Sequence, residues 1–239
     1  NEPHGISNLK WNKIQQNVLN EIRKIDPIHT IIVGAANFNN YNDLDSLTIF
    51  NDKNIIYTFH FYEPFLFTHQ GASWINPSME KVKNIPFPYN ENKMYLDNSY
   101  SKTWIQSLFN RYKIEGTETF LYKMINKIVE FKKKNNVKLF CGEFGVLNFY
   151  VDKNDRNIWH KLVSENFIKN EISWTVWDFK SDFGMFNSDQ KINLQLLESL
   201  NFKPINYANQ IFDKCKTKIF SDYCDNGIQP IKSANLKNI

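Results

Sequence analysis

Residues 139–146 read LFCGEFGV, and this stretch decides the fold. Its apolar run is typical of a short buried β-strand, and the strand ends on one carboxylate, Glu143, between two glycines. Burying an unpaired carboxylate is costly, so Glu143 is either neutralised by partners or kept for chemistry. The flanking glycines permit close backbone approach, which favours the chemical role over a solvated strand end.

Strands and helices alternate on both sides of this stretch. Strands separated by helices pair in parallel through right-handed crossovers, and strands that are apolar on both faces fit a covered sheet. Residues 1–10 are expected to be a loop, and residues 63–116 form a long connection without a strong period. The sequence predicts strands at 29–35, 54–62, 137–143 and 172–177, helices at 11–25, 117–131, 154–168 and 193–200, and a short helix at 44–50.

Candidate functional side chains gather at the C-terminal ends of these strands, where α/β proteins build their sites. His60 and Tyr62 are two apart, so both leave the strand on one face. A satisfied core histidine is the alternative for His60. Trp174 and Trp177 lie on opposite faces; Trp174 suits the core, and Trp177 can stack on a sugar ring.

A second acidic position, Glu2, opens the chain in the sequence Asn1-Glu2-Pro3. A glutamate near a chain end is usually solvated, but Pro3 fixes the backbone directly after this one. The Asn1 amide can donate a hydrogen bond to a substrate hydroxyl. We therefore interpret Glu2 and Glu143 as the paired carboxylates of a sugar-cleaving enzyme. The aromatic residues 63–116 form either a wall of the substrate cleft or a cover over the core.

Composition excludes several other classes. The 239 residues carry a net charge of +4 from scattered lysines, without the basic stripe that nucleic-acid binding needs. No apolar run is long enough to cross a membrane, no metal-ligand spacing appears, and no cofactor is expected. An acyl hydrolase is disfavoured because a G-x-S-x-G motif is missing. Cys141 fits a buried position, whereas Cys215 and Cys224 can form one bridge, which implies export.

Four motifs occur in an order that resembles a known family: NEP at 1–3, HFY at 60–62, GEFG at 142–145 and WTVWD at 174–178. Together they resemble the C-terminal part of glycoside hydrolase family five, a cellulase-like family of the retaining clan. The resemblance covers residues 1–186. It implies that Glu2 is the acid/base and Glu143 the nucleophile. By the same resemblance the central sugar subsite is lined by Asn1, His60, Tyr62 and Trp177.

The resemblance also implies a fold. The chain is expected to be a single catalytic domain of the (β/α)8 TIM-barrel type, truncated so that it runs from the end of strand four through strand eight. Residues 203–239 are then a tail of uncertain structure. Four strands alone do not close a barrel, and they leave two open edges and an uncovered inner face. Residues 1–239, produced alone, are therefore expected to aggregate or to be inactive.

The activity that follows from the resemblance is retaining hydrolysis of a β-glycosidic bond, with a β-1,4-glucan and endoglucanase-like action preferred. Such an enzyme needs its carboxyl groups about 5–5.5 Å apart and no metal. The alternative is a non-catalytic carbohydrate-binding or scaffold protein. Glucan, mannan and xylan remain open, as does endo or exo action. The expected partner is a polysaccharide or oligosaccharide, bound by a secreted or periplasmic monomer.

Overall fold

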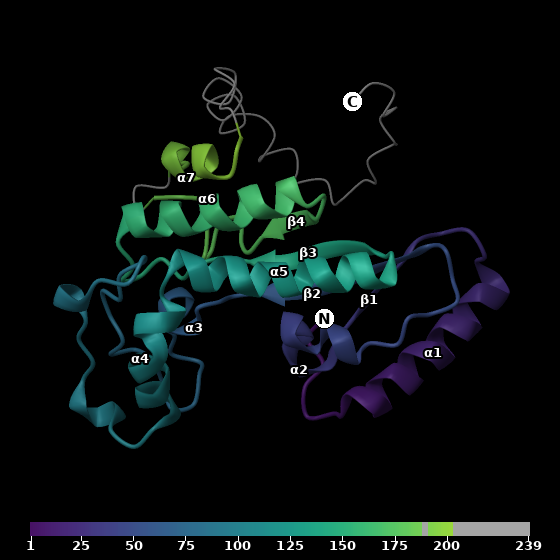
Figure 1. The fold of residues 1–239 in the computed structure, drawn as a ribbon, viewed down its shortest axis with the longest axis horizontal. Coiled ribbons are helices and arrows are strands. Elements are labelled where there is room, and N and C mark those ends of the chain that lie inside the picture. Colours follow the sequence, from purple (N-terminus) through teal and green to yellow (C-terminus); the bar gives the residue numbers. More distant parts are fainter. Residues whose placement is uncertain (188–190, 203–239) are drawn as a thin grey trace, which may run out of the picture. The chain divides into compact units, whose positions relative to one another are not determined.

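The computed structural model of the protein describes residues 1–187 and 191–202. Residues 1–201 form one compact unit. The predicted tail at 203–239, including Cys215 and Cys224, lies outside the described residues. Strands and helices alternate along the chain (Figure 1), in the order α1 (Asn8–Ile25), β1 (Ile31–Gly34), α2 (Ala36–Asn39), η1 (Tyr41–Ser46), β2 (Ile55–Phe61), α3 (Phe65–Thr68), η2 (Glu91–Lys93), η3 (Asn98–Tyr100), α4 (Trp104–Glu115), α5 (Glu118–Asn135), β3 (Lys138–Phe144), α6 (Lys153–Lys169), β4 (Ser173–Val176) and α7 (Leu194–Ser199).

The strands of the described residues form one sheet in the order β1-β2-β3-β4, and every pair is parallel. Because each strand is followed by a connection that returns to the same edge, all C-terminal strand ends meet on one side. The predicted parallel pairing is confirmed. The sheet thus brings together chain segments that are more than a hundred residues apart.

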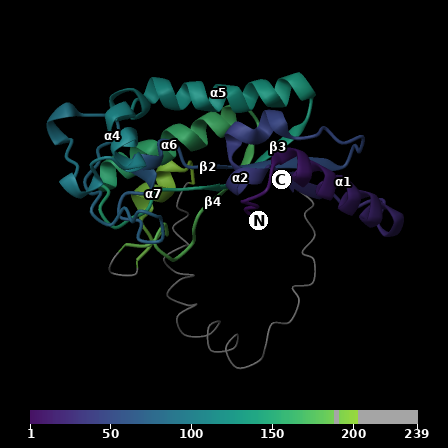
Figure 2. The ribbon, with the colours of Figure 1, turned by 90° about the horizontal axis from the view of Figure 1, so that it is seen from below.

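Helices α5 and α6 cover one face of this sheet (Figure 2). On that face Tyr57 packs edge-on against Phe131 of α5, and Phe59 packs against Phe167 of α6. The opposite face is open in the described part of the chain. Ile32 of β1 is 53% exposed, and Thr175 of β4 is exposed as well. The apolar pattern of a sheet covered on both faces is therefore not matched in the described residues, whereas the uncovered inner face expected for four barrel strands alone is present.

Local sequence explains where the two longest helices begin and end. The Ser7 hydroxyl accepts the backbone N–H of Lys10, so α1 begins at Asn8, three residues before the apolar pattern at 11–25 starts. The Thr117 hydroxyl caps α5 in the same way. Helix α5 ends at Asn135, and its C-cap residue Asn136 adopts the left-handed conformation, after three lysines that complement the helix dipole.

Two predicted elements differ from the structure. A short helix was predicted at 44–50, but the helical turn is the 3₁₀ segment Tyr41–Ser46, because the Asn40 side chain caps it by accepting the N–H of Asn42. The long connection 63–116 contains helix α4, which was missed. Its inward side chains do recur at helical spacing, at Ile105, Leu108, Phe109 and Tyr112.

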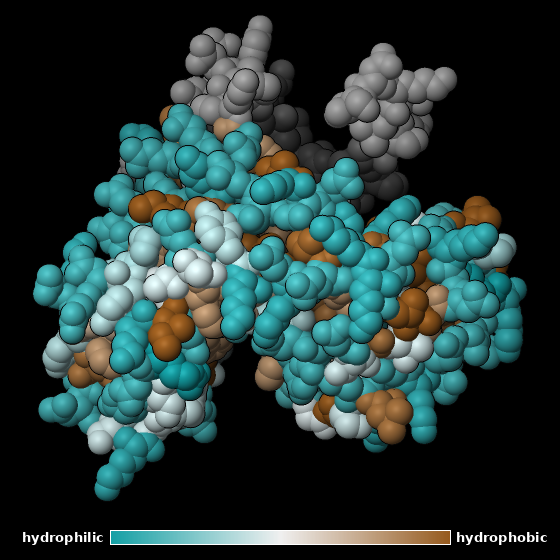
Figure 3. Space-filling model, viewed as in Figure 1, coloured by the Kyte–Doolittle hydropathy of each residue, from teal (hydrophilic) through white to brown (hydrophobic). Residues whose placement is uncertain are grey.

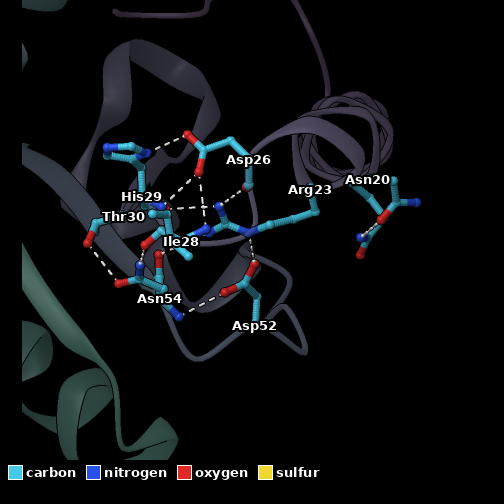
Figure 4. Close-up of polar contacts among 9 residues, drawn as sticks. Asn20, Arg23, Asp26, Ile28, His29, Thr30, Asp52 and Asn54 are labelled. Carbon is cyan, nitrogen blue, oxygen red and sulfur yellow. Dashed lines mark hydrogen bonds and ion pairs between the residues drawn. The ribbon is translucent and has the colours of Figure 1, made fainter.

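A polar network lies at the N-terminal ends of the strands, across the sheet from the edge where their C-terminal ends meet (Figure 4). Arg23, in the last turn of α1, donates to Asp52 at 2.6 Å and to the carbonyls of Asp26 and His29 at 2.9 Å each. Asp52 in turn accepts the N–H of Asn54, directly before β2. The Arg23 guanidinium holds the pKa of Asp52 below its usual range. The network joins α1 to both loops that lead into β1 and β2.

The surface seen in Figure 3 is largely hydrophilic, with separate hydrophobic patches. Within the described residues, no helix is both long and apolar enough to cross a membrane.

Candidate active site

A β-bulge in β3 aims Glu143. Cys141 pairs with Phe59 of β2, but the next pair is Glu143 with His60, so Gly142 is an extra residue. Regular alternation would put Glu143 on the helix-covered face beside Cys141. The bulge instead places it on the same face as His60, and Phe144 turns into the core with no exposed surface.

Four side chains meet around Glu143, which is only 7% exposed. The Asn1 amide donates to one carboxylate oxygen at 3.1 Å, and the Tyr62 hydroxyl donates to the other at 3.0 Å. His60 Nδ1 lies 3.3 Å from Glu143 Oε2 and 2.7 Å from Glu2 Oε1. A carboxylate oxygen of Glu2 and one of Glu143 lie within 4.8 Å of each other. One imidazole nitrogen is thus shared by two carboxylates.

The backbone of Tyr62 is fixed by hydrogen-bonded residues that follow it in the chain. The Thr68 hydroxyl donates to the Tyr62 carbonyl at 2.6 Å and lies 2.9 Å from His69 Nδ1. Because the Thr68 proton is used, His69 Nδ1 must be the donor of that second contact. Burial lowers the pKa of His69 to about 3, so the ring is neutral. Burial and the Glu143 carboxylate raise the pKa of Tyr62, which keeps its hydroxyl a donor.

Trp177 follows β4 and is 46% exposed, whereas Trp174 packs against the core as predicted. The backbone of Trp177 donates to the Phe144 carbonyl, and its own carbonyl lies so close to Gly145 that a Cβ there would approach to 2.1 Å. The loops after β3 and β4 are therefore in close contact, and Gly145 is required for it.

The buried Arg156 of α6 ties these two loops together. It is 4% exposed and donates to the carbonyls of Val146 at 3.2 Å, Phe183 at 2.6 Å and Gly184 at 2.9 Å. Burial lowers its pKa to about 10, which leaves it charged at neutral pH. The Phe183 ring lies 5.9 Å from that of Tyr62. Arg156 thereby supports the aromatic side chain that flanks Tyr62.

The short segment α2 contains a left-handed turn, which lies beside the segment that carries Glu2. Asn37, Phe38 and Asn39 have positive φ angles of 53°, 62° and 54°, a conformation that costs energy for residues other than glycine. The turn donates the N–H of Phe38 to the Pro3 carbonyl at 3.1 Å. It also presents the half-exposed Phe38 ring, which stacks on His4 at 4.9 Å. The turn thus fastens the segment that carries Glu2.

The structure brings five predicted site residues together in one contact network and places the sixth, Trp177, on the neighbouring loop. Glu2, His60 and Glu143 also have the spacing and donor types that a divalent cation accepts. Sequence reasoning missed Thr68, His69 and Arg156. The run of aromatic and polar residues directly after Tyr62 is a signal from which Thr68 and His69 could have been predicted. A single arginine in a helix, such as Arg156, gives no such signal.

The sequence profile of the cellulase family, glycosyl hydrolase family 5, matches residues 1–183. The chain belongs to this family. The family that the four motifs indicated is confirmed.

Named relatives agree with this assignment. Endoglucanase C of Acetivibrio thermocellus is 31% identical over 194 residues, which are 80% of this chain and 55% of the relative. Endoglucanase 3 of Fibrobacter succinogenes is 31% identical over 193 residues, 78% of this chain and 29% of the relative. The chain therefore spans about half, or less, of the length of these relatives.

Solved structures show the same fold. Endoglucanase Cel5A of the hyperthermophile Thermotoga maritima superposes with a TM-score of 0.68 at 32% identity, covering 84% of this chain and 57% of Cel5A. The cellulose synthase subunit Z of Clostridioides difficile gives a TM-score of 0.67 at 30% identity, with 84% and 58% covered. The prediction of an α/β fold of the TIM-barrel type is confirmed.

Proposed function

We propose that this chain carries the acid/base and the nucleophile of a retaining β-1,4-glucanase. The observation that supports it most is the carboxylate pair at the C-terminal edge of the sheet, with oxygens of Glu2 and Glu143 within 4.8 Å. Retaining enzymes keep their carboxyl groups about 5–5.5 Å apart, whereas inverting enzymes leave room for a water between them. The endoglucanase relatives favour β-1,4-glucan as the substrate.

Each role follows from a contact. Glu143, whose oxygens are held by Asn1 and Tyr62, attacks the anomeric carbon and forms an ester. Glu2, which is more accessible, gives its proton to the leaving glycosidic oxygen as that bond breaks. Glu2 then takes a proton from water, the resulting hydroxide attacks the anomeric carbon, and the ester to Glu143 breaks. The configuration at the anomeric carbon is retained after two displacements.

The remaining predicted residues orient the sugar and the two carboxylates. We assign to Trp177 the role of stacking on the pyranose face. We assign to His60 the role of fixing the positions of the Glu2 and Glu143 carboxylates relative to each other. No step uses a metal ion, so EDTA should leave the rate unchanged. We further propose that the protein acts as a secreted or periplasmic monomer on its polysaccharide. The alternative function is sugar binding without turnover.

The test uses a chimera in which residues 1–201 replace the matching segment of Endoglucanase C. We expect the chimera to release reducing ends from soluble β-1,4-glucan, and Glu2→Gln and Glu143→Gln each to lower kcat by at least a thousandfold. The control is Glu130→Gln on the exposed side of α5, which should keep full activity.

Retention has its own readout in the same chimera. A 2-deoxy-2-fluoro cellobioside with a good leaving group should label the peptide that contains Glu143, and mass spectrometry of the digest would detect it. Labelling elsewhere, or turnover that survives Glu143→Gln, contradicts the assignment. Binding of β-glucan without any turnover would favour the non-catalytic alternative.

A further inference from the structure

A second pocket lies beside the C-terminal end of β2 but outside the carboxylate site. It has a volume of about 520 Å³, within the usual range for small-ligand sites. Segment η1, the turn after β2, and helices α4 and α5 form its walls, and none of Glu2, His60 and Glu143 lines it. Nothing in the proposed mechanism uses this pocket.

Two polar groups in the pocket lining have weak partners. Tyr41 is 5% exposed, and its hydroxyl donates to the Met124 sulfur at 3.1 Å. A thioether is a weak acceptor, and buried polar groups usually have stronger partners. The Glu63 carboxylate accepts only the backbone N–H of Phe65, at a long 3.3 Å, among the hydrogen bonds of the described residues. Both groups line the pocket, and a hydroxyl and a carboxyl group can each take further hydrogen bonds beyond these contacts.

An aromatic wall stands beside these polar groups. Trp104 is 40% exposed, and its ring nitrogen donates to the Asn76 carbonyl at 3.2 Å. The Phe65 ring lies 6.1 Å from that of Trp104. A half-exposed indole whose nitrogen is already bonded offers its face to the C–H side of a pyranose ring. Sugar-binding sites combine an aromatic face with side chains that exchange hydrogen bonds with the sugar hydroxyls. The Trp104 face beside Tyr41 and Glu63 has this combination.

Charged side chains of both signs line the pocket. Arg111, Lys123 and Lys127 are cations, Glu63 and Glu115 are carboxylates, and Arg111 is paired with Glu115 at 2.6 Å. Burial raises the pKa of Glu63. The mixed charges and the aromatic wall together favour a ligand with hydroxyl groups and an apolar ring face over a compact anion such as phosphate.

We propose that this pocket is a second, non-catalytic site that binds a β-glucan chain through Trp104, Tyr41 and Glu63. Only the choice of β-glucan as the sugar rests on the proposed function. A glucan strand held here stays on the protein between cleavage events at the carboxylate pair. The pocket thus raises the local substrate concentration without contacting the scissile bond.

Methionine methyl signals test the site directly. The chain has four methionines, and Met124 lies in the pocket lining next to Tyr41. Residues 1–239, labelled with carbon-13 on the methionine methyl groups, are titrated with cellotetraose, and the Met124 signal is assigned with Met124→Leu. We expect a saturable shift of that signal in the wild type and an equal shift in Glu143→Gln.

Matched variants decide the outcome. Trp104→Ala should raise the dissociation constant for cellotetraose at least tenfold. Tyr41→Phe, which removes one oxygen, should raise it about threefold to tenfold. Tyr95→Ala, at a tyrosine that is 68% exposed on the same connection, should change nothing. Circular dichroism checks that each variant is folded, and the same titration in the chimera serves if a variant of residues 1–239 precipitates.

Three results overturn the proposal: a Met124 signal that cellotetraose does not move, an unchanged dissociation constant in both Trp104→Ala and Tyr41→Phe, or a shift caused by inorganic phosphate and not by cellotetraose. A chimera that fails to hydrolyse β-glucan while Met124 still responds would remove the catalytic assignment and leave this site intact.

Discussion

At the scale of single residues, the extra glycine in β3 decides which face of the sheet carries Glu143. The carbonyl of this glycine, Gly142, accepts the Thr175 hydroxyl of β4 at 2.6 Å. A Cβ at Gly142 would approach Thr58 Oγ1 to 3.0 Å and His60 Nε2 to 3.3 Å. The glycine thus leaves room for the imidazole that lies between the two carboxylates.

Gly142→Ala in the chimera should therefore lower kcat roughly tenfold, equivalent to about 1.4 kcal/mol of barrier, because His60 must move by a few tenths of an ångström. Steady-state kinetics on soluble β-1,4-glucan measure the effect, and KM should change less than kcat. An alanine variant with unaltered kcat would show that the position of His60 is not critical.

Residue-scale features were predictable from sequence only in part. The motifs placed Glu2, His60, Tyr62 and Glu143 in one site, because parallel strands end at a common edge. The bulge itself was not predictable, since alternation along β3 puts Glu143 on the covered face. The left-handed turn at 37–39 had one signal, the asparagines, which adopt positive φ more readily than most residues.

At the scale of elements, the two ends of the sheet have different tasks. The C-terminal ends hold the carboxylate pair, and the N-terminal ends are tied to α1 by Arg23. In barrels of this type, residues at the N-terminal face serve stability. The Arg23 side chain is 17% exposed and that of Asp52 is 15% exposed, so solvent screens their pairing only weakly.

Arg23→Ala should lower the free energy of unfolding by about 2 kcal/mol, because it removes charge-assisted hydrogen bonds to a carboxylate and three carbonyls. Urea unfolding of residues 1–239 measures the loss. Lys24→Ala, on the neighbouring exposed ion pair with Glu21, is the matched control and should change stability by less than about 0.5 kcal/mol. Equal losses in both variants would contradict the role of Arg23.

Element prediction succeeded for helices with one clear apolar face and for strands with a continuous apolar run, and it failed at the short helix predicted at 44–50 and in the connection 63–116. Helix α4 has helical spacing, yet the surrounding segment is rich in aromatic residues that pack without any period. Tyr100, for example, lies in a 3₁₀ turn and donates to the Ser78 carbonyl. Such contacts arise from tertiary packing, so local patterns do not reveal them.

At the scale of the whole molecule, a buried histidine makes stability depend on pH. His160 has no exposed surface, and burial with the nearby Arg156 lowers its pKa to about 3. The unfolded chain has the ordinary pKa of about 6.5. Below that pH the unfolded state binds a proton that the folded state does not bind. The contribution of neutral His160 is therefore complete above about pH 6.5 and is lost as the pH falls towards 3.

Between pH 7.5 and pH 5.0, His160 alone should reduce the free energy of unfolding by about 2 kcal/mol. His160→Gln should show a correspondingly smaller drop over this range, whatever its stability at pH 7.5. Urea unfolding at both pH values gives the difference. His4→Gln, at an exposed histidine, should keep the wild-type pH dependence. Parallel curves for wild type and His160→Gln would exclude this histidine as the cause.

The open sheet has a consequence for activity. The four strands described here leave β1 and β4 with one neighbour each, and Ile32 is exposed on the uncovered face. A barrel closes only with its full number of strands. Residues 1–239, produced by themselves, should therefore give no turnover of soluble β-1,4-glucan in an assay where the chimera is active. Clear turnover by residues 1–239 would contradict this expectation.

The additional residue in β3 also bears on how this strand can vary. Deleting Gly142 would place Cys141, Glu143 and Phe144 in regular register with Phe59, His60 and Phe61, so Glu143 would stay on the face that carries His60. The strand would lose the carbonyl that accepts the Thr175 hydroxyl and the local distortion that a bulge imposes. A variant shortened by this one residue would therefore separate the contribution of the bulge from that of the carboxylate. Libraries that seek new specificities can include this shortened strand beside substitutions in β3.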